Sequence, residues 1–333
     1  MTYTLVRATT PPTSLARVPG SRDDAAPLRI GVVQHAWQPD LDALRAELSE
    51  AVAAAAAEGA KIVFLPELTL SRYPADTVPE GPADVLAEDL ETGPTRAWAA
   101  EAAAANDVYV HASLYQKTGD DDGRGLNTAI IVAPTGEIVA QTHKLHIPVT
   151  AGYYEDKYFR PGPAQEPYPV HEVAGIPARF GLPTCWDEWF PEVARAYSLQ
   201  GADVLVYPTA IGSEPDHPEF DTQPLWRQVI VGNGIANGTF MVVPNRTGGE
   251  LRPDGTPGNT FYGSSFVSDP YGRILAEAPR DEKAVLVVDL DLPQRGDWLE
   301  LFPFLATRRP DTYASLAGTE GVGASAASGE PAR

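Results

Sequence analysis

The chain has 333 residues, of which 43% are hydrophobic and 21% are charged. This composition is typical of a packed globular protein and excludes wholesale disorder, a collagen repeat and a coiled coil. Lysine and arginine number 25 against 45 aspartate and glutamate residues, so the formal net charge of −20 argues against binding to nucleic acid or to an anionic membrane.

Both ends of the chain lack an apolar period. Residues 1–27 are rich in threonine, proline, serine and alanine, and residues 314–333 form a tail of small residues. Such segments cannot bury enough apolar surface to fold, so we predict disorder at both ends. The folded domain is then expected over residues 28–313.

The first half of this domain alternates apolar, β-rich runs with alanine-rich helical stretches. The expected helices are 41–59 and 95–107, with the first ending at Gly59. The expected strands are 28–34, 61–67, 108–115, 126–134 and 137–144, and a Pro-Thr-Gly turn joins the last two.

The second half follows the same order of elements. The expected helices are 190–201 and 225–238, and the expected strands are 178–184, 203–208, 239–245, 261–269, 272–278 and 284–290. This order favours an α/β fold in which two similar layers of the αββα type pack sheet against sheet. No Gly-x-Gly-x-x-Gly or P-loop motif is present, so the usual signals of a nucleotide-phosphate site are missing.

The cysteine count limits the chemistry and the compartment. A single cysteine, Cys185, cannot form an intramolecular disulfide or a Cys-x-x-Cys metal site. No run reaches the roughly 18 to 20 apolar residues that cross a bilayer, and the N-terminus lacks the apolar core of a secretory signal. We therefore expect a cytoplasmic protein without a membrane segment.

Three residues of catalytic type end apolar strands. Cys185 lies between an expected strand and an expected helix, where a helix N-terminus favours the thiolate. Glu67 and Lys144 end two other strands, and the carboxyl edge of an α/β sheet is where such sheets place their sites. Taken singly, Cys185 is equally a small buried hydrophobe, and the two charged residues are equally strand ends that reach solvent.

Three segments carry a family resemblance. F-L-P-E-L, H-K-L-H-I-P and C-W-D-E-W-F-P-E, in that order, resemble the nitrilase or carbon-nitrogen hydrolase superfamily over about residues 28–313. Segments such as G-Y-Y-E-D-K-Y-F-R-P-G and Y-P-T-A-I-G-S-E-P are most similar to its N-carbamoylputrescine amidase branch. The resemblance implies a four-layer αββα sandwich, a homodimer or higher homo-oligomer built through the outer helices, and neither a metal nor an organic cofactor.

The resemblance also implies roles for individual residues. Cys185 would be the nucleophile, Glu67 the general base, and Lys144 the cation that stabilises the tetrahedral intermediate. Glu155 would be the second glutamate beside this triad, and the backbone N–H of Trp186 would complete the oxyanion hole. This chemistry suits an amide or ureide, whose weakly electrophilic carbonyl benefits from a covalent route through sulfur.

The residues after the nucleophile bear on the substrate. Asp187 and Glu188 suit a protonated amine and repel a carboxylate, although both could instead complement a helix dipole or be paired internally. Glu188 stands where this branch is expected to have glutamine. The remaining candidate substrate-binding residues are aromatic or basic: Tyr73, Tyr153, Trp186 and His146. His143 and His146 are spaced like metal ligands, but no third ligand accompanies them.

The sequence therefore predicts a cysteine amidohydrolase that cleaves an N-carbamoyl amine to the amine, carbon dioxide and ammonia. An alternative is an amidohydrolase of N-carbamoyl-β-alanine or another carbamoyl amino acid, or an ω-amidase, with Arg246 or another pocket arginine holding the carboxylate. An alternative of another class is a binding module without turnover. The expected partner is a small amide or ureide.

Overall fold

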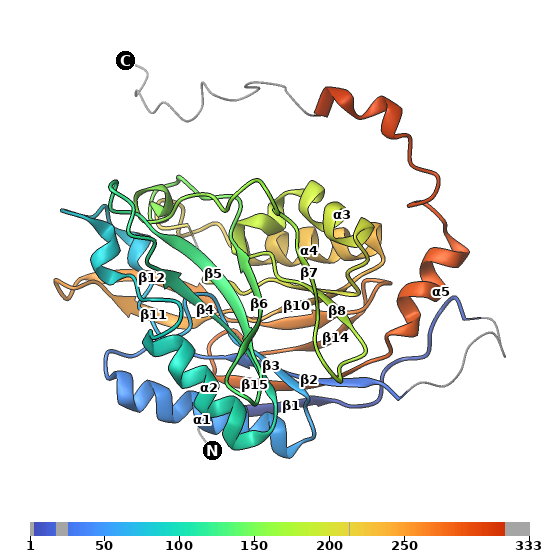
Figure 1. The fold of residues 1–333 in the computed structure, drawn as a ribbon, viewed down its shortest axis with the longest axis horizontal. Coiled ribbons are helices and arrows are strands. Elements are labelled where there is room, and N and C mark those ends of the chain that lie inside the picture. Colours follow the sequence, from blue (N-terminus) through green and yellow to red (C-terminus); the bar gives the residue numbers. More distant parts are fainter. Residues whose placement is uncertain (1–2, 18–25, 213, 317–333) are drawn as a thin grey trace.

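Two β-sheets lie face to face between two pairs of helices. The computed structural model describes residues 3–17, 26–212 and 214–316. Helices α1 and α2 cover the outer face of one sheet, and α3 and α4 cover the outer face of the other (Figure 1). The expected four-layer αββα sandwich is thereby confirmed. The helices are α1 (Leu41–Ala57), α2 (Pro94–Asn106), α3 (Pro191–Leu199), α4 (Gln223–Asn237) and α5 (Pro293–Leu301).

The first sheet has seven strands, in the order β1 (Thr4–Ala8), β15 (Ala284–Leu290), β2 (Leu28–Gln34), β3 (Ile62–Phe64), β4 (Tyr109–Gln116), β5 (Leu126–Val132) and β6 (Ile138–His143). The second sheet has six, in the order β14 (Ile274–Glu277), β13 (Phe266–Ser268), β10 (Phe240–Val243), β9 (Val204–Val206), β8 (Arg179–Gly181) and β7 (Val170–Glu172). A separate hairpin consists of β11 (Thr247–Leu251) and β12 (Pro257–Tyr262).

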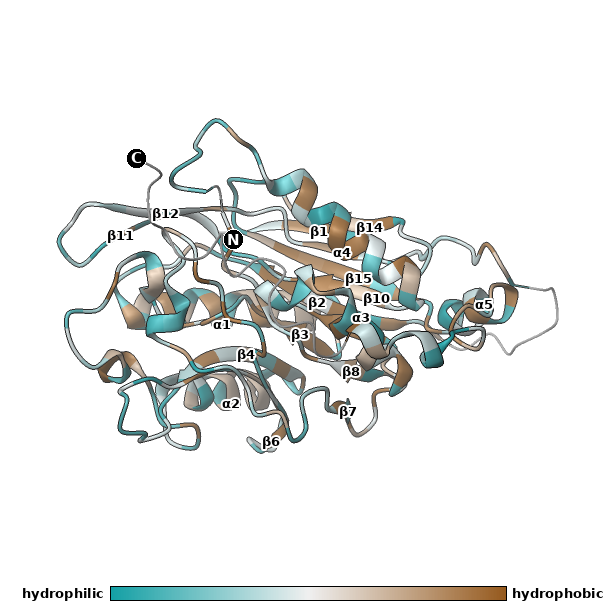
Figure 2. Ribbon diagram, turned by 90° about the horizontal axis from the view of Figure 1, so that it is seen from above, coloured by the Kyte–Doolittle hydropathy of each residue, from teal (hydrophilic) through white to brown (hydrophobic). Residues whose placement is uncertain are grey.

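Successive side chains of β15 pack alternately into two apolar cores, one on each face of the first sheet. Leu286 and Val288 pack into the apolar core between the sheets, whereas Val285 and Val287 pack into the core under α1 and α2. Successive side chains of a strand point to opposite faces, so an uninterrupted apolar run fits a strand that is buried on both sides. In Figure 2 the brown of β15 and β10 marks this buried centre of the sandwich.

Helix boundaries follow the local signals of the sequence. The Asp40 side chain accepts a hydrogen bond from the Ala43 N–H and so caps α1. Just past the C-terminal end of α1, Gly59 has a φ of +92°, a conformation that glycine adopts without strain. Pro191 opens α3, as expected for a proline in the first helical turn.

The structure corrects the prediction at the N-terminus and in the second half. Residues 4–8 form β1, which pairs in parallel with β15, so the predicted disorder over residues 1–27 is wrong there. The expected strand 261–269 is interrupted, because Gly263 and Ser264 have positive φ angles and separate β12 from β13. Helix α5 and the strands β7 and β11 were not expected.

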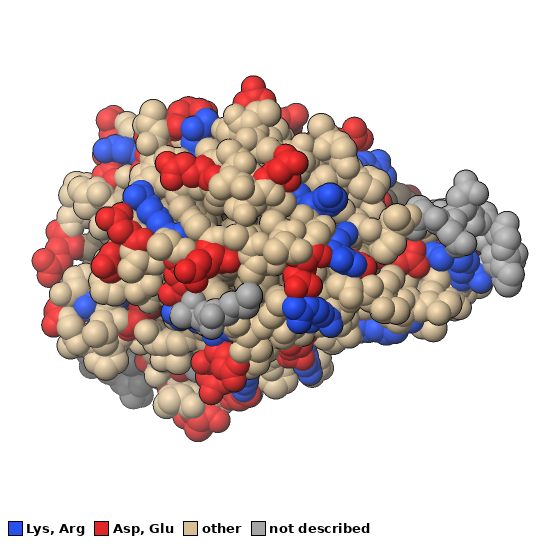
Figure 3. All heavy atoms as spheres, turned by 90° about the horizontal axis from the view of Figure 1, so that it is seen from below, with Lys and Arg blue, Asp and Glu red and all other residues tan. Residues whose placement is uncertain are grey.

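The predicted C-terminal tail is described only at its start, where Ala314–Leu316 forms a single helical turn. Residues 317–333 lie outside the described part of the chain. Among the described residues, no helix is both long and apolar enough to cross a membrane. On the face shown in Figure 3, acidic and basic side chains are interspersed over the surface.

Candidate active site

Glu67, Lys144 and Cys185 come together where strands of both sheets end. Glu67 follows β3, Lys144 directly follows β6, and Cys185 follows β8. Lys144 Nζ lies 2.8 Å from Glu67 Oε1, and both side chains are fully buried. The charges of Glu67 and Lys144 both act on the Cys185 thiol. The three residues therefore do not lie at the edge of a single sheet, as the sequence suggested, because β3 and β6 belong to the first sheet and β8 belongs to the second.

The Glu67 carboxylate is held by three donors. Asn127 Nδ2 donates to Oε1 at 2.7 Å alongside Lys144, and the Ala210 N–H donates to Oε2 at 2.9 Å. Donors on both oxygens fix the orientation of the carboxylate. Sequence reasoning missed Asn127, although a buried asparagine in the otherwise apolar strand β5 is a signal that could have identified it.

Arg246 stabilises the turn that follows Glu67. Its guanidinium donates to the carbonyl oxygens of Glu67, Leu68 and Ser71, and it forms an ion pair with Glu250. Leu68 has a φ of +52°, so this clamp holds a strained backbone conformation. Because Arg246 is fully buried and already paired, the alternative in which it binds a substrate carboxylate is wrong.

A second glutamate shares the Lys144 ammonium. Lys144 Nζ lies 2.6 Å from Glu155 Oε2, and the Tyr73 hydroxyl donates to Glu155 Oε1 at 2.8 Å. Burial disfavours the Lys144 ammonium, but the charges of Glu155 and Glu67 outweigh burial and raise the lysine pKa. Burial raises the pKa of Glu155 to about 7. Tyr73, expected to bind substrate, therefore has a structural partner in Glu155.

Glu155 is expected to make stability depend on pH. Its pKa is higher in the folded protein than in the unfolded chain, so its contribution is most favourable at acid pH and is lost as the pH rises from about 4.5 to about 7. We expect Glu155→Gln, which cannot ionise, to gain about 1 to 3 kcal/mol relative to the wild type between pH 5 and pH 7.5. Urea unfolding at both pH values measures this difference. The exposed variant Glu166→Gln should show no such trend, and equal trends in both variants would contradict the assignment.

Cys185 lies on a sharp turn at the start of the one-turn helix η4 (Cys185–Trp189). Its φ is +41°, and its N–H donates to the Pro208 carbonyl at 3.0 Å, which ties the turn to the end of β9. The residue is 5% exposed. Burial and the charge of Glu67 raise the pKa of the thiol, which is opposite to the effect expected of a helix N-terminus. Deprotonation then requires a base close by.

The Asp187 carboxylate connects two loops through hydrogen bonds. Its carboxylate accepts from the Thr184 N–H, from the His146 N–H and from His146 Nδ1, the last at 2.7 Å. The His146 ring in turn stacks on Phe190 with 3.7 Å between ring centroids. Internal pairing, the alternative for Asp187, is therefore what the structure shows, whereas contact of the partly exposed His146 with substrate stays a prediction.

Glu188 differs from its neighbour. It is fully buried, and neither carboxyl oxygen has a hydrogen-bond partner among the described residues. Burial raises its pKa well above the usual range, although the Trp226 N–H lowers it. The charges of Glu67 and Lys144 also act on the Glu188 carboxyl. Glu188 therefore remains a candidate for contact with a ligand.

Aromatic residues surround the cluster. Tyr153 is buried, and its hydroxyl accepts a hydrogen bond from the Gly212 N–H at 3.0 Å. Burial, and to a lesser extent the charge of Glu214, raise the pKa of this hydroxyl. Trp186 is partly buried, with its ring 6.2 Å from that of Trp189. Trp186 directly follows Cys185 in the chain, and Tyr153 is near enough to the cysteine for a charge on its sulfur to act on the Tyr153 hydroxyl.

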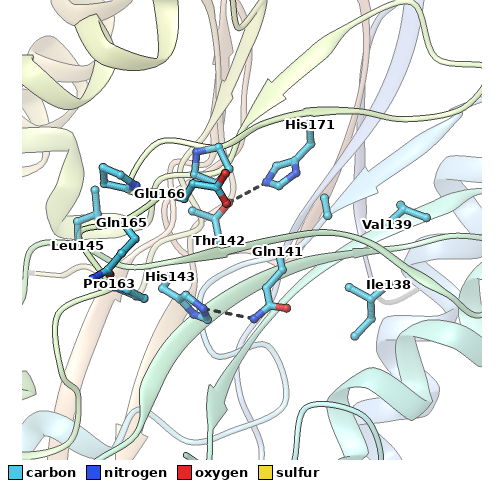
Figure 4. Close-up of a pocket in the computed structure, with 13 residues that line it drawn as sticks. Ile138, Val139, Gln141, Thr142, His143, Leu145, Pro163, Gln165, Glu166 and His171 are labelled. Carbon is cyan, nitrogen blue, oxygen red and sulfur yellow. Dashed lines mark hydrogen bonds between the residues drawn. The ribbon is translucent and has the colours of Figure 1, made fainter. Parts of the chain in front are cut away.

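A surface groove of about 560 Å³ lies along β6, and it contains the His143 ring (Figure 4). His143 contacts Gln141, and His171 contacts Thr142, at 3.3 and 3.0 Å respectively. Burial lowers the pKa of both histidines, so they are neutral near pH 7. No three metal-binding side chains come together within the described part of the chain.

Comparisons with known proteins find a family and several relatives for this chain. A family model for carbon-nitrogen hydrolases matches residues 29–299. A citrullinase from Francisella tularensis is 33% identical over 291 residues, which cover 87% of this chain and 98% of the citrullinase. An N-carbamoylputrescine amidase from Arabidopsis thaliana is 34% identical over 296 residues, which cover 88% of this chain and 96% of the amidase.

Solved structures give the same result for the fold. A carbon-nitrogen hydrolase from Helicobacter pylori superimposes with a TM-score of 0.79 at 31% identity, covering 88% of this chain and 99% of that one. An amidase from Nesterenkonia has a TM-score of 0.67 at 24% identity and supports the fold alone. The region matched by the family model contains Glu67, Lys144, Glu155 and Cys185.

Proposed function

Because the chain belongs to the carbon-nitrogen hydrolase family, whose members hydrolyse carbon-nitrogen bonds other than peptide bonds, we propose that it removes the carbamoyl group from an N-carbamoyl amine. The observation that carries this proposal is the buried cluster of Glu67, Lys144 and Glu155 around a single cysteine. A binding module would have no use for such a cluster, since burying charged groups is costly.

In the first step, the Cys185 sulfur attacks the carbamoyl carbon while Glu67 accepts the thiol proton. The carbonyl oxygen becomes an oxyanion, which Lys144 and the backbone N–H of Trp186 stabilise. Glu67 then returns the proton to the departing nitrogen, which leaves as ammonia or as the amine, and a thioester-type carbamoyl enzyme remains.

In the second step, Glu67 activates a water molecule that attacks the thioester carbon. The carbon-sulfur bond breaks, the thiol is restored, and the released acid decomposes to carbon dioxide and the second nitrogen product. One N-carbamoyl amine and one water thus yield the amine, carbon dioxide and ammonia. Glu155 and Tyr73 keep the Lys144 ammonium in place throughout.

Two observations favour a substrate with a cationic end. Acidic side chains lie near the nucleophile, with Glu188 on the same turn and Glu214 beside Tyr153. Arg246 is buried and paired, so it is not available to a substrate carboxylate. The relatives named N-carbamoylputrescine amidase and citrullinase support a ureide substrate. We therefore propose an N-carbamoylputrescine-like substrate.

The assembly of this chain into a homodimer or higher homo-oligomer through its outer helices stays a prediction.

Ammonia release from N-carbamoylputrescine, citrulline and N-carbamoyl-β-alanine tests this proposal. We expect kcat/KM for N-carbamoylputrescine to exceed that for N-carbamoyl-β-alanine at least about tenfold, because one mismatched charge is worth more than about 1.4 kcal/mol in a buried site. The kcat/KM for citrulline, which carries both an ammonium and a carboxylate, should lie between the values for the other two substrates. Faster release from N-carbamoyl-β-alanine would contradict the proposed substrate while leaving the chemistry at Cys185 intact.

A further inference from the structure

We propose that Glu188 receives the cationic group of the substrate and releases its own proton to solvent when that cation binds. This inference rests on the proposed function, because it requires a ureide with a protonated amine. It goes beyond that function by assigning the cation to one residue and by making recognition depend on proton release.

The position of Glu188 places it beside the reacting cysteine. Glu188 and Cys185 share the short helix η4, three residues apart, and Glu188 is near enough for a charge on its carboxyl to act on the Cys185 thiol. Asn233 Nδ2 of α4 donates to the Glu188 carbonyl at 2.9 Å, which fixes η4 against that helix. The Glu188 side chain is thus held close to the nucleophile on a rigid support.

The groups around Glu188 leave its carboxyl unsatisfied. Neither oxygen has a partner at hydrogen-bond distance and angle in the described part of the chain, and the same holds for the Tyr207 hydroxyl. The Trp226 N–H is near enough to lower the pKa of Glu188, but it does not reach this geometry either. Asp187, the other acid on the turn, is already bound by backbone N–H groups and His146. Unmet hydrogen-bonding capacity in a buried position costs folding free energy, and a ligand can relieve this cost.

Titratable groups face Glu188 from several elements. The charges of Glu67, Lys144 and Asp187 act on its carboxyl. When ionised, Glu188 would act in turn on the Cys185 thiol and on the hydroxyls of Tyr207 and Tyr262. Among these groups only Lys144 is a cation, and it already binds two carboxylates.

The charge state of Glu188 follows from these neighbours. Without a countercharge of its own, the buried carboxyl is neutral in the empty site, and burial raises its pKa accordingly. An arriving ammonium group supplies the missing countercharge. The carboxyl then ionises, the proton passes to solvent, and an ion pair forms between the substrate ammonium and the Glu188 carboxylate.

Butylurea provides a matched neutral ligand, since it has the carbamoyl group and four-carbon chain of N-carbamoylputrescine without the terminal amine. Calorimetric titration of the inactive Cys185→Ala protein at pH 7, in buffers of different ionisation enthalpy, counts the protons released. We expect about one more proton released for N-carbamoylputrescine than for butylurea. The difference should vanish when Glu188→Gln is added, and equal proton release for both ligands would overturn the inference.

Kinetics of the active protein give a second test. We expect Glu188→Gln to raise KM for N-carbamoylputrescine at least about tenfold with little change in kcat, and to change kcat/KM for butylurea less than twofold. For the wild type, KM for N-carbamoylputrescine should fall as the pH rises, whereas KM for butylurea should not. Glu192→Gln, an exposed neighbour on α3, is the matched control and should behave as the wild type.

The outcomes separate the two proposals. If the wild type hydrolyses neither ligand, the proposed function fails. If it hydrolyses both and Glu188→Gln affects them equally, the proposed function stands and the assignment of the cation to Glu188 is wrong. Unfolding of Glu188→Gln at or above the wild-type temperature would show that any loss of activity does not come from misfolding.

Discussion

Replacing Cys185 by alanine is expected to abolish ammonia release from every ureide and amide, lowering kcat by at least about 10⁴-fold. The reason is that no other side chain of the cluster can form the covalent intermediate: Lys144 is held as an ammonium by two carboxylates, and Glu67 is occupied by three donors. Steady-state assays with N-carbamoylputrescine measure the loss. Turnover at the wild-type rate in Cys185→Ala would rule out covalent catalysis at this position.

The matched variant Cys185→Ser keeps the size of the side chain and removes the thiol. It should fold as the wild type and lose nearly as much activity as the alanine variant, since a hydroxyl is a far weaker nucleophile than a thiol. Cys185 is the only cysteine in the chain, so alkylation by iodoacetamide reports on this residue alone. Mass spectrometry should show one adduct per inactivated molecule.

Replacing Lys144 by methionine is expected to affect both activity and stability. The variant loses the cation proposed to stabilise the oxyanion, so kcat should fall by about 10²- to 10³-fold or more. It also leaves the buried carboxyls of Glu67 and Glu155 facing each other without a countercharge. Removing one partner of a buried ion pair costs about 3 to 5 kcal/mol, and we expect a loss of that size at pH 7.5.

The sign of the pH dependence identifies the cause of this loss. Burial raises the pKa of Glu155 above that of the unfolded chain, and the loss of Lys144 removes the charge that lowers it. The stability of the variant is then greatest at acid pH, where Glu155 is protonated, and falls as the pH rises. Urea unfolding from pH 5 to pH 8 should show Lys144→Met growing less stable relative to the wild type.

Lys157→Met is the matched control, since Lys157 is a lysine of the same region whose side chain is 49% exposed and pairs with Asp156. We expect it to change stability by no more than about 1 kcal/mol at any pH. If both variants lost the same stability, the effect of Lys144→Met would be that of any lysine removed from this region rather than of the buried cluster.

The difference between Asp187 and Glu188 shows where sequence reasoning reaches its limit. Adjacent acids on one turn are indistinguishable in the sequence, where both suit either a cationic ligand or internal pairing. The structure separates them, because Asp187 is bound by Thr184 and His146 whereas Glu188 has no hydrogen-bond partner among the described residues. The partner His146 is 41 residues away along the chain, and only folding brings it into contact.

The surroundings of Arg246 and Cys185 likewise could not be predicted from the sequence. A lone arginine near a predicted site suggested a carboxylate ligand, but Arg246 is used by the carbonyl groups that follow Glu67, about 180 residues earlier in the chain. The thiol of Cys185 follows a similar logic. A helix N-terminus favours its thiolate, yet burial and the nearby Glu67 outweigh that effect.

The sequence by itself determined the layered α/β class and most strands and helices, because apolar periodicity is a local pattern. It also placed Glu67, Lys144 and Cys185 near strand ends, but their meeting at one site depends on how the two sheets pack, since β3 and β6 belong to the first sheet and β8 belongs to the second. Tertiary structure alone decided that residues 4–8 pair with residues 284–288, that Asn127 and Arg246 support Glu67, and that Glu188 is buried without a hydrogen-bond partner in the described chain. Pairing and burial depend on contacts between distant segments, and the local sequence of each segment does not specify its partner.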